Sequence, residues 1–193
     1  MMTNNNLNLD RAEEPSATAS FVWISILTLA GVGGSLVISC VTPFVALAVA
    51  LAGTVRLSVA LRAMTVIWLA NQFIGFAFFH FPRTPNSVSL GLASGAAALL
   101  SVVVAAVVMK RATAVPILAR AALALVLGFA AYEAVLFVAA LFLGGVETFS
   151  PAIIAQLALN NAAWLAGLIA LNELVAILCK PWLGAAPRML KAA

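Results

Sequence analysis

A small set of polar and aromatic side chains interrupts the long apolar segments of this chain, and their chemistry needs an explanation. In chain order they are Asn71, Gln72, Phe76, His80, Arg83, Tyr132, Glu133, Asn160, Asn161 and Trp164. Amide, phenol, carboxylate and imidazole groups bind small ligands through hydrogen bonds, and imidazole also binds transition metals. We therefore treat these residues as candidate ligand-binding residues, with His80 as a candidate metal ligand.

Spacing places several of these groups together. Gln72, Phe76 and His80 follow one another at four-residue intervals, which puts them near one face of a helix. Glu133 lies within an apolar segment, where a carboxylate requires a partner, protonation or water. At 1.5 Å per residue, most of the set falls in the middle or outer part of a bilayer, with His80 and Arg83 at the outer rim. The pattern predicts one cavity open to the outside.

A structural interpretation of the same residues stays open. Asparagine and glutamine within membrane helices often only bond neighbouring helices, at about 0.6 kcal/mol each. A histidine beside aromatic residues at an interface is commonly an anchor. Asn172 and Glu173 lie near the inner end of the last segment and could join helices. Gly91 and Gly95 form a GxxxG pattern, which an alanine-rich chain also produces by chance.

Composition indicates which elements position these groups. The 193 residues are 65% hydrophobic and only 8% charged, whereas soluble domains are about 25% charged. In hydrocarbon every backbone amide must be satisfied internally, and the continuous apolar runs exclude the alternation of a barrel. We expect an all-α fold, a polytopic membrane helical bundle. The net charge of +4 comes from scattered basic residues, so nucleic acid is not an expected partner and the lipid bilayer is.

The apolar runs predict six transmembrane helices in a domain over residues 20–180, between cytoplasmic tails at 1–19 and 181–193. Their expected bounds are Ser20–Ser39, Pro43–Thr54, Ala63–Phe81, Val88–Met109, Ala121–Leu143 and Pro151–Cys179. The second is shorter than the ~20 residues that usually span a bilayer. Prolines and paired glycines end the segments.

Charge predicts the topology. With both termini inside, nine of the ten basic residues lie on the cytoplasmic side and only Arg83 lies outside, a strong positive-inside bias. Cys40 and Cys179 then lie at opposite faces, too far apart for a disulfide. Few lysines and many alanines are typical of the bacterial inner membrane, the location that we expect.

Catalytic motifs are missing from the sequence. It contains no GxxxxGK[ST] phosphate-binding loop, and its single histidine excludes HExxH. No nucleophile accompanies His80 in a plausible triad. We therefore expect no enzyme and no catalytic cofactor.

Six short helices with both ends inside resemble the layout of the S-component, the substrate-binding subunit of energy-coupling-factor vitamin transporters. The segment Trp68–Phe76, followed by Phe81–Thr84, is similar to the third helix and following loop of proteobacterial S-component-like proteins. These include the solitary cobalamin-binding type. In that type a cysteine near the outer end binds the corrin cobalt; this chain has no cysteine there, and His80 occupies the corresponding region.

The resemblance implies capture of a small-molecule vitamin from outside. In the most specific form of this prediction, cobalamin is the bound substrate and His80 binds its cobalt. It implies gating loops at Cys40–Thr42, Phe81–Ser87 and Gly144–Ser150. It also implies two kinds of partner, a coupling transmembrane subunit and ATPases. Solitary members of the family act without these partners. His80 as a rim residue of a pocket for another vitamin stays open.

Two other functions remain as alternatives. One is a structural or assembly subunit of a larger membrane complex, in which the polar residues only join helices. The other is a small enzyme or carrier for lipid or quinone, which the missing catalytic residues disfavour.

Overall fold

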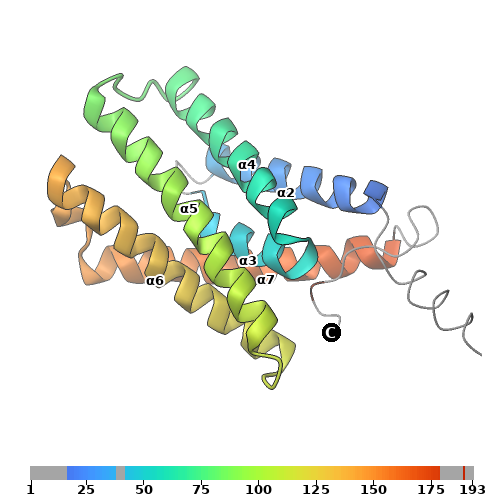
Figure 1. The fold of residues 1–193 in the computed structure, drawn as a ribbon. Helices are drawn as coiled ribbons and strands as arrows, with labels where there is room; N and C mark the ends of the chain where they lie inside the picture. The colour runs from blue at the N-terminus through green and yellow to red at the C-terminus, as the bar shows by residue number, and fades with distance from the viewer. Residues whose placement is uncertain (1–16, 38–41, 179–188, 190–193) are drawn as a thin grey trace, which may run out of the picture.

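The computed structural model describes residues 17–37, 42–178 and 189. Cys40, Cys179 and most of the two predicted tails lie outside these residues. Every regular element in the described part is helical (Figure 1). The helices are α2 (Ala17–Val37), α3 (Phe44–Thr54), α4 (Leu57–Ala77), α5 (Pro85–Arg111), α6 (Ile117–Leu143), the 3-10 helix η1 (Val146–Thr148) and α7 (Pro151–Leu178).

Four of these helices, α4 to α7, are long and apolar enough to cross a membrane. This supports the predicted membrane helical bundle in its coarse form. Helix α3 has only 11 residues, about 16 Å at 1.5 Å per residue, and is too short to span hydrocarbon. Six complete spans and the orientation of the chain stay predictions.

Several helix boundaries differ from the expected ones. Helix α4 begins at Leu57 and runs through Arg62, where we expected a loop at the interface. Arg62 is exposed, so its long stem carries the guanidinium away from the apolar surface without ending the helix. Helix α5 begins at Pro85 because Thr84 caps it, accepting a hydrogen bond from the Ser87 amide at 3.3 Å.

Helix α3 forms the centre of the bundle. All eight residues from Phe44 to Leu51 are buried, and α2, α4, α5, α6 and α7 surround them. This explains a run in which every position is apolar, since no face of α3 meets lipid or water. A helix shorter than a bilayer is tolerated here because other helices surround it on all sides.

The first turn of α3 leaves amide groups without a partner in the helix itself. Asn161 of α7 supplies one: its Oδ1 accepts a hydrogen bond from the Ala46 amide at 3.2 Å, and its Nδ2 donates to the Leu157 carbonyl at 3.0 Å. Asn71 of α4 donates from Nδ2 to the hydroxyl of Thr42, just before α3. Two long helices therefore hold the start of the short one.

Two ends of the bundle can be distinguished. At one, which we call the hairpin end (residues 78–84 and 144–150), the Asn86 side chain donates to the Leu143 carbonyl at 3.2 Å and joins α5 to α6. The other, the basic end, contains Arg56, Lys110, Arg111 and Arg120.

Arg120 is turned inward at the basic end rather than outward. It is only 8% exposed, and its guanidinium donates to the carbonyls of Met109, Thr113 and Val115 at 3.1 to 3.3 Å. These three hydrogen bonds fix the connection between α5 and α6. Arg120 is therefore a structural residue of this turn as well as one of the basic residues that we counted for topology.

The glycines of the GxxxG pattern face α4. A Cβ added at Gly95 would lie 2.5 Å from the Trp68 ring, and one at Gly91 would lie 2.6 Å from Gln72 Oε1. The Trp68 indole also donates to the Gly91 carbonyl at 3.0 Å. The pattern therefore makes room for two large side chains of α4.

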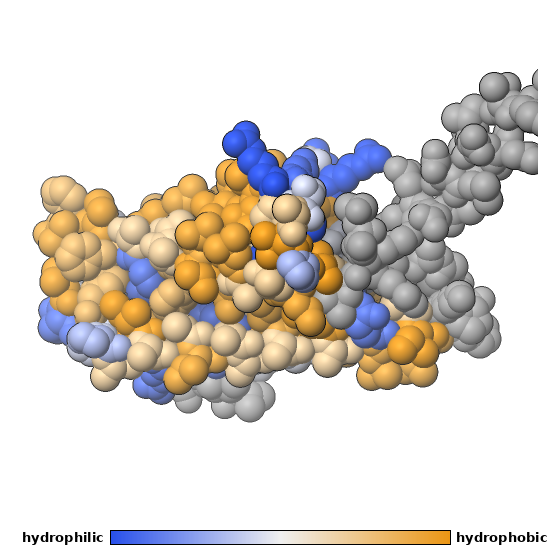
Figure 2. All heavy atoms as spheres, turned by 90° about the horizontal axis from the view of Figure 1, so that it is seen from below, coloured by the Kyte–Doolittle hydropathy of each residue, from blue (hydrophilic) through white to orange (hydrophobic). Residues whose placement is uncertain are grey.

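Apolar side chains cover most of the face shown in Figure 2, and hydrophilic residues form a few separate patches. Among the exposed apolar residues are Phe21, Val126, Leu159 and Phe142, the last 84% exposed. Such a surface is costly in water and ordinary in lipid.

We predict that Asn161→Ala destabilises the protein by about 1–3 kcal/mol, because the buried Ala46 amide loses its partner. Asn160→Ala is the matched control, since the Nδ2 of Asn160 is buried without a hydrogen bond in the described part of the chain. Thermal unfolding in detergent should show a lower Tm for the first variant only. Equal losses in both variants would contradict the anchoring role of Asn161.

Candidate functional site

A cavity of about 260 Å³ opens where α6 and α7 diverge, at the start of α3. Helices α6 and α7 make few direct contacts with each other, and the segment containing η1 closes the space between them at the hairpin end. The lining residues are Thr42, Phe44, Val45, Tyr132, Glu133, Leu136, Thr148, Phe149, Ile153, Leu157 and Asn161.

The polar groups of this cavity come from four elements. Tyr132 and Glu133 project from α6, Asn161 from α7, Thr42 from the segment before α3, and Thr148 from η1. The Thr148 hydroxyl donates to the Gly145 carbonyl at 2.7 Å, which leaves its lone pairs for another donor. Glu133 and Thr148 therefore offer hydrogen-bond acceptors to the cavity, and the Tyr132 hydroxyl can donate or accept.

Aromatic rings form the apolar part. Phe44 and Tyr132 lie with their ring centroids 6.3 Å apart. Phe149 packs edge-on against Phe137 at 5.3 Å, which holds Phe149 at the mouth of the cavity. Rings at these spacings are in favourable contact and present a rigid wall to a planar ligand.

Gly144 and Gly145 explain how the closing segment turns back over the cavity. Both have positive φ, 88° and 99°, a conformation that glycine adopts without a steric cost. The chain can therefore reverse directly after α6 and place Thr148 and Phe149 at the cavity.

The charge pattern of the cavity is one-sided. Glu133 is its only acidic residue, and the described lining contains no basic residue. Helix α3 begins with Phe44 at the wall of this space, and the partial positive charge of its N-terminus works against a cation there, so the preference for a cation rests on Glu133 alone. A carboxylate so placed in an apolar segment favours a ligand that carries a positive charge or several hydrogen-bond donors.

Of the ten predicted site residues, three line this cavity: Tyr132, Glu133 and Asn161. Asn71 is one hydrogen bond away, through the Thr42 hydroxyl. Asn161 is already engaged by Ala46 and Leu157, so it shapes the site more than it offers free groups.

Asn160 and Trp164 line another cavity, of about 350 Å³, on the side of α7 that faces Ala30 of α2. Although adjacent in sequence, Asn160 and Asn161 thus serve different faces, since successive helical residues point about 100° apart. Gln72 lies against Gly91 in the contact between α4 and α5.

His80 and Arg83 belong to the turn at the hairpin end, and Phe76 lies in the last turn of α4 just before it. His80 is exposed, with a positive φ of 54°, and histidine is among the residues that tolerate this left-handed conformation. The turn lets the Phe81 ring fold back onto Gly75 and against Phe76, 6.1 Å between ring centroids. Arg83 is exposed. None of these three residues lines the cavity between α6 and α7.

The sequence reasoning passed over Phe44 and Phe149 as site residues. Phe149 lies within the predicted gating loop Gly144–Ser150, so its neighbourhood was expected. The sequence does contain a signal for Phe44. The apolar segment after Thr42 and Pro43 is too short to span a bilayer, which indicates that its helix starts inside the bundle.

Comparisons with protein-family models, with curated proteins and with solved structures found no match to this chain.

The turn predicts how His80 responds to substitution. His80→Gly should retain or raise the Tm, because glycine adopts a positive φ without strain, whereas His80→Val should lower stability by about 1–2 kcal/mol. Thermal unfolding of the two variants in detergent measures this. A Tm for His80→Val equal to that of the wild type would contradict the turn role.

Proposed function

We propose that this chain is a non-enzymatic membrane protein that captures a small vitamin-like solute in the cavity between α6 and α7, as a substrate-binding component for uptake. One observation carries the proposal: Glu133 faces a cavity without any basic residue in its described lining, at the start of a buried helix. Placing a carboxylate there is costly. A bound cationic or donor-rich solute offsets that cost.

The arrangement resembles a general feature of solute carriers. In these proteins, interrupted helices begin or end near the bilayer midplane, and their backbone ends line the substrate site. Helix α3 begins at the cavity in the same manner, held by Asn71 and Asn161. The site would then be fixed by the bundle, while the segment of Thr148 and Phe149 would admit the solute.

Size limits the ligand. Drug-sized ligands occupy pockets of roughly 300–1,000 Å³, and this cavity of about 260 Å³ lies just below that range. It suits one heterocyclic ring with short polar substituents, stacked against Phe44 or Phe149. A corrinoid macrocycle is much larger, and His80 lies on the exposed turn, so cobalamin is the less favoured version of the proposal.

Uptake also needs energy, which the S-component resemblance assigns to a coupling transmembrane subunit and ATPases. We propose these as partners of the chain in its bacterial inner membrane, with both termini in the cytoplasm. The basic residues gathered at one end of the bundle support that orientation.

A second function, a structural subunit of a larger membrane complex, has one specific observation in its favour. Two buried polar atoms on α7, Asn160 Nδ2 and Glu173 Oε1, have no hydrogen-bond partner in the described part of the chain. Buried polar groups are normally paired, so a partner helix along α7 would satisfy them.

Ligand binding separates these functions. We predict that a single-ring vitamin rich in hydrogen-bond donors, tested with a panel that includes pyridoxine, binds the purified protein in titration calorimetry. Glu133→Gln should weaken that binding at least tenfold, since a hydrogen bond to a charged group contributes about 1.5–3 kcal/mol. Glu147→Gln is the matched control, because Glu147 lies in η1 and is exposed outside the cavity.

A cobalamin titration followed by absorption spectroscopy, with His80→Ala beside the wild type, tests the corrinoid version. Bands that shift only when His80 is present would assign cobalt binding to this residue.

Equal effects of Glu133→Gln and Glu147→Gln on vitamin binding would contradict the proposed site. Absence of binding for the whole panel, with a stable partner protein co-purifying, would favour the structural subunit.

A further inference from the structure

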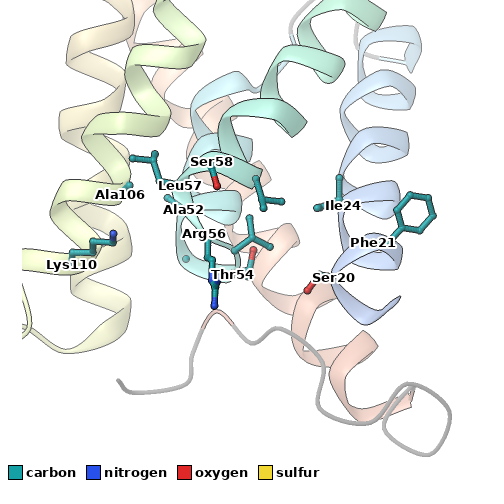
Figure 3. Close-up of a pocket in the computed structure, with 13 residues that line it drawn as sticks. Ser20, Phe21, Ile24, Ala52, Thr54, Arg56, Leu57, Ser58, Ala106 and Lys110 are labelled. Carbon is teal, nitrogen blue, oxygen red and sulfur yellow. The ribbon is translucent and has the colours of Figure 1, made fainter. Parts of the chain in front are cut away.

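Another hollow lies at the basic end and shares no lining residue with the cavity between α6 and α7. This basic pocket has a volume of about 1050 Å³ and lies between the start of α2, the end of α3, the start of α4 and the end of α5. Figure 3 shows Lys110 reaching from α5 toward Arg56, with Ser20 of α2 on the opposite side.

The polar lining of the basic pocket suits an anion. Arg56 and Lys110 contribute positive charge, Ser20 and Ser58 contribute hydroxyl donors, and the described lining contains no acidic residue. The Thr54 hydroxyl accepts a hydrogen bond from the Trp23 indole at 3.1 Å, which joins α2 to α3 at the wall of the basic pocket. A phosphate would find several donors here, and charge-assisted bonds to phosphate are strong.

An apolar furrow continues from the basic pocket along α2 and α4. It has a volume of about 560 Å³ and shares Phe21, Ile24 and Val59 with the pocket. From Phe21 to Leu29 it follows α2 over nine residues, about 12 Å along the axis. Arg62 flanks it, on the exposed face of α4.

Pocket and furrow together have the form of a phospholipid, with a charged head and an extended apolar tail. A soluble phosphate compound has no acyl chain to bind in the furrow. A zwitterionic lipid would place its own cation among Arg56, Arg62 and Lys110, where like charges repel. We propose that the basic pocket and the furrow bind one anionic phospholipid, its phosphate beside Lys110 and one acyl chain along α2. Basic pockets between membrane helices are known to hold such headgroups.

The test reconstitutes the full chain in nanodiscs of equal phosphatidylglycerol and phosphatidylcholine, and native mass spectrometry measures which lipid is retained. The wild type should retain phosphatidylglycerol preferentially. Lys110→Gln should lower the retained ratio about fivefold, as expected for one cation near a headgroup. Arg111→Gln is the matched control, because Arg111 is the adjacent exposed cation and lies outside both hollows.

A second pair tests the acyl chain. Ser25→Phe places a ring in the furrow and should also reduce retention, whereas Ala122→Phe adds the same ring at an exposed position of α6 and should not. Equal loss in Lys110→Gln and Arg111→Gln, or equal retention of the two lipids, would overturn the proposal. Displacement of the lipid by glycerol 3-phosphate at equal concentration would overturn the lipid assignment in favour of a soluble anion.

Discussion

A helix that begins inside an apolar bundle must have its first amide groups satisfied by other parts of the protein, and this constraint organises the described helices. Helix α3 is apolar from Phe44 to Gly53 and has no capping side chain of its own, so its partners come from elsewhere. Asn161 reaches it across 115 residues of sequence, and Asn71 holds the preceding Thr42. Because an unsatisfied buried group costs about 1–3 kcal/mol, the positions of α4 and α7 are tied to the start of α3.

The same arrangement creates the candidate site. Helices α6 and α7 diverge around the start of α3, and the cavity between them receives Tyr132 and Glu133 from one side and Thr148 and Phe149 from the closing segment. The proposed binding site therefore depends on two features: the start of α3 is buried in the bundle, and side chains leave a cavity open beside it. At the other end of the bundle Arg120 closes the α5–α6 connection by three hydrogen bonds to carbonyls. At that end the connection between α5 and α6 is thus fixed, while the hairpin end is covered by short turns.

The sequence predicted the helical class well, because composition and long apolar runs determine it directly. It also predicted that Tyr132, Glu133 and Asn161 lie near one another, since depth along a helix follows from residue number. It did not separate Asn160 from Asn161, or Gln72 from Asn71, because the direction of each side chain depends on how its helix is rotated in the bundle. The role of His80 was similarly hidden: its positive φ accompanies the contact of the Phe81 ring with Gly75, and residue spacing does not encode that contact.

The central claim is that water reaches the cavity between α6 and α7 within the membrane. Thiol labelling tests it most directly, in a background where Cys40 and Cys179 are replaced by serine. Leu136 lines the cavity, whereas Val138 lies about half a turn further along α6, outside that lining, and is 53% exposed on a surface that the account places against lipid. Thiols react as thiolates, which form only where water is present. The account predicts that a small water-soluble methanethiosulfonate labels Leu136→Cys and not Val138→Cys in membranes; labelling of Val138→Cys alone, or of neither, would contradict it.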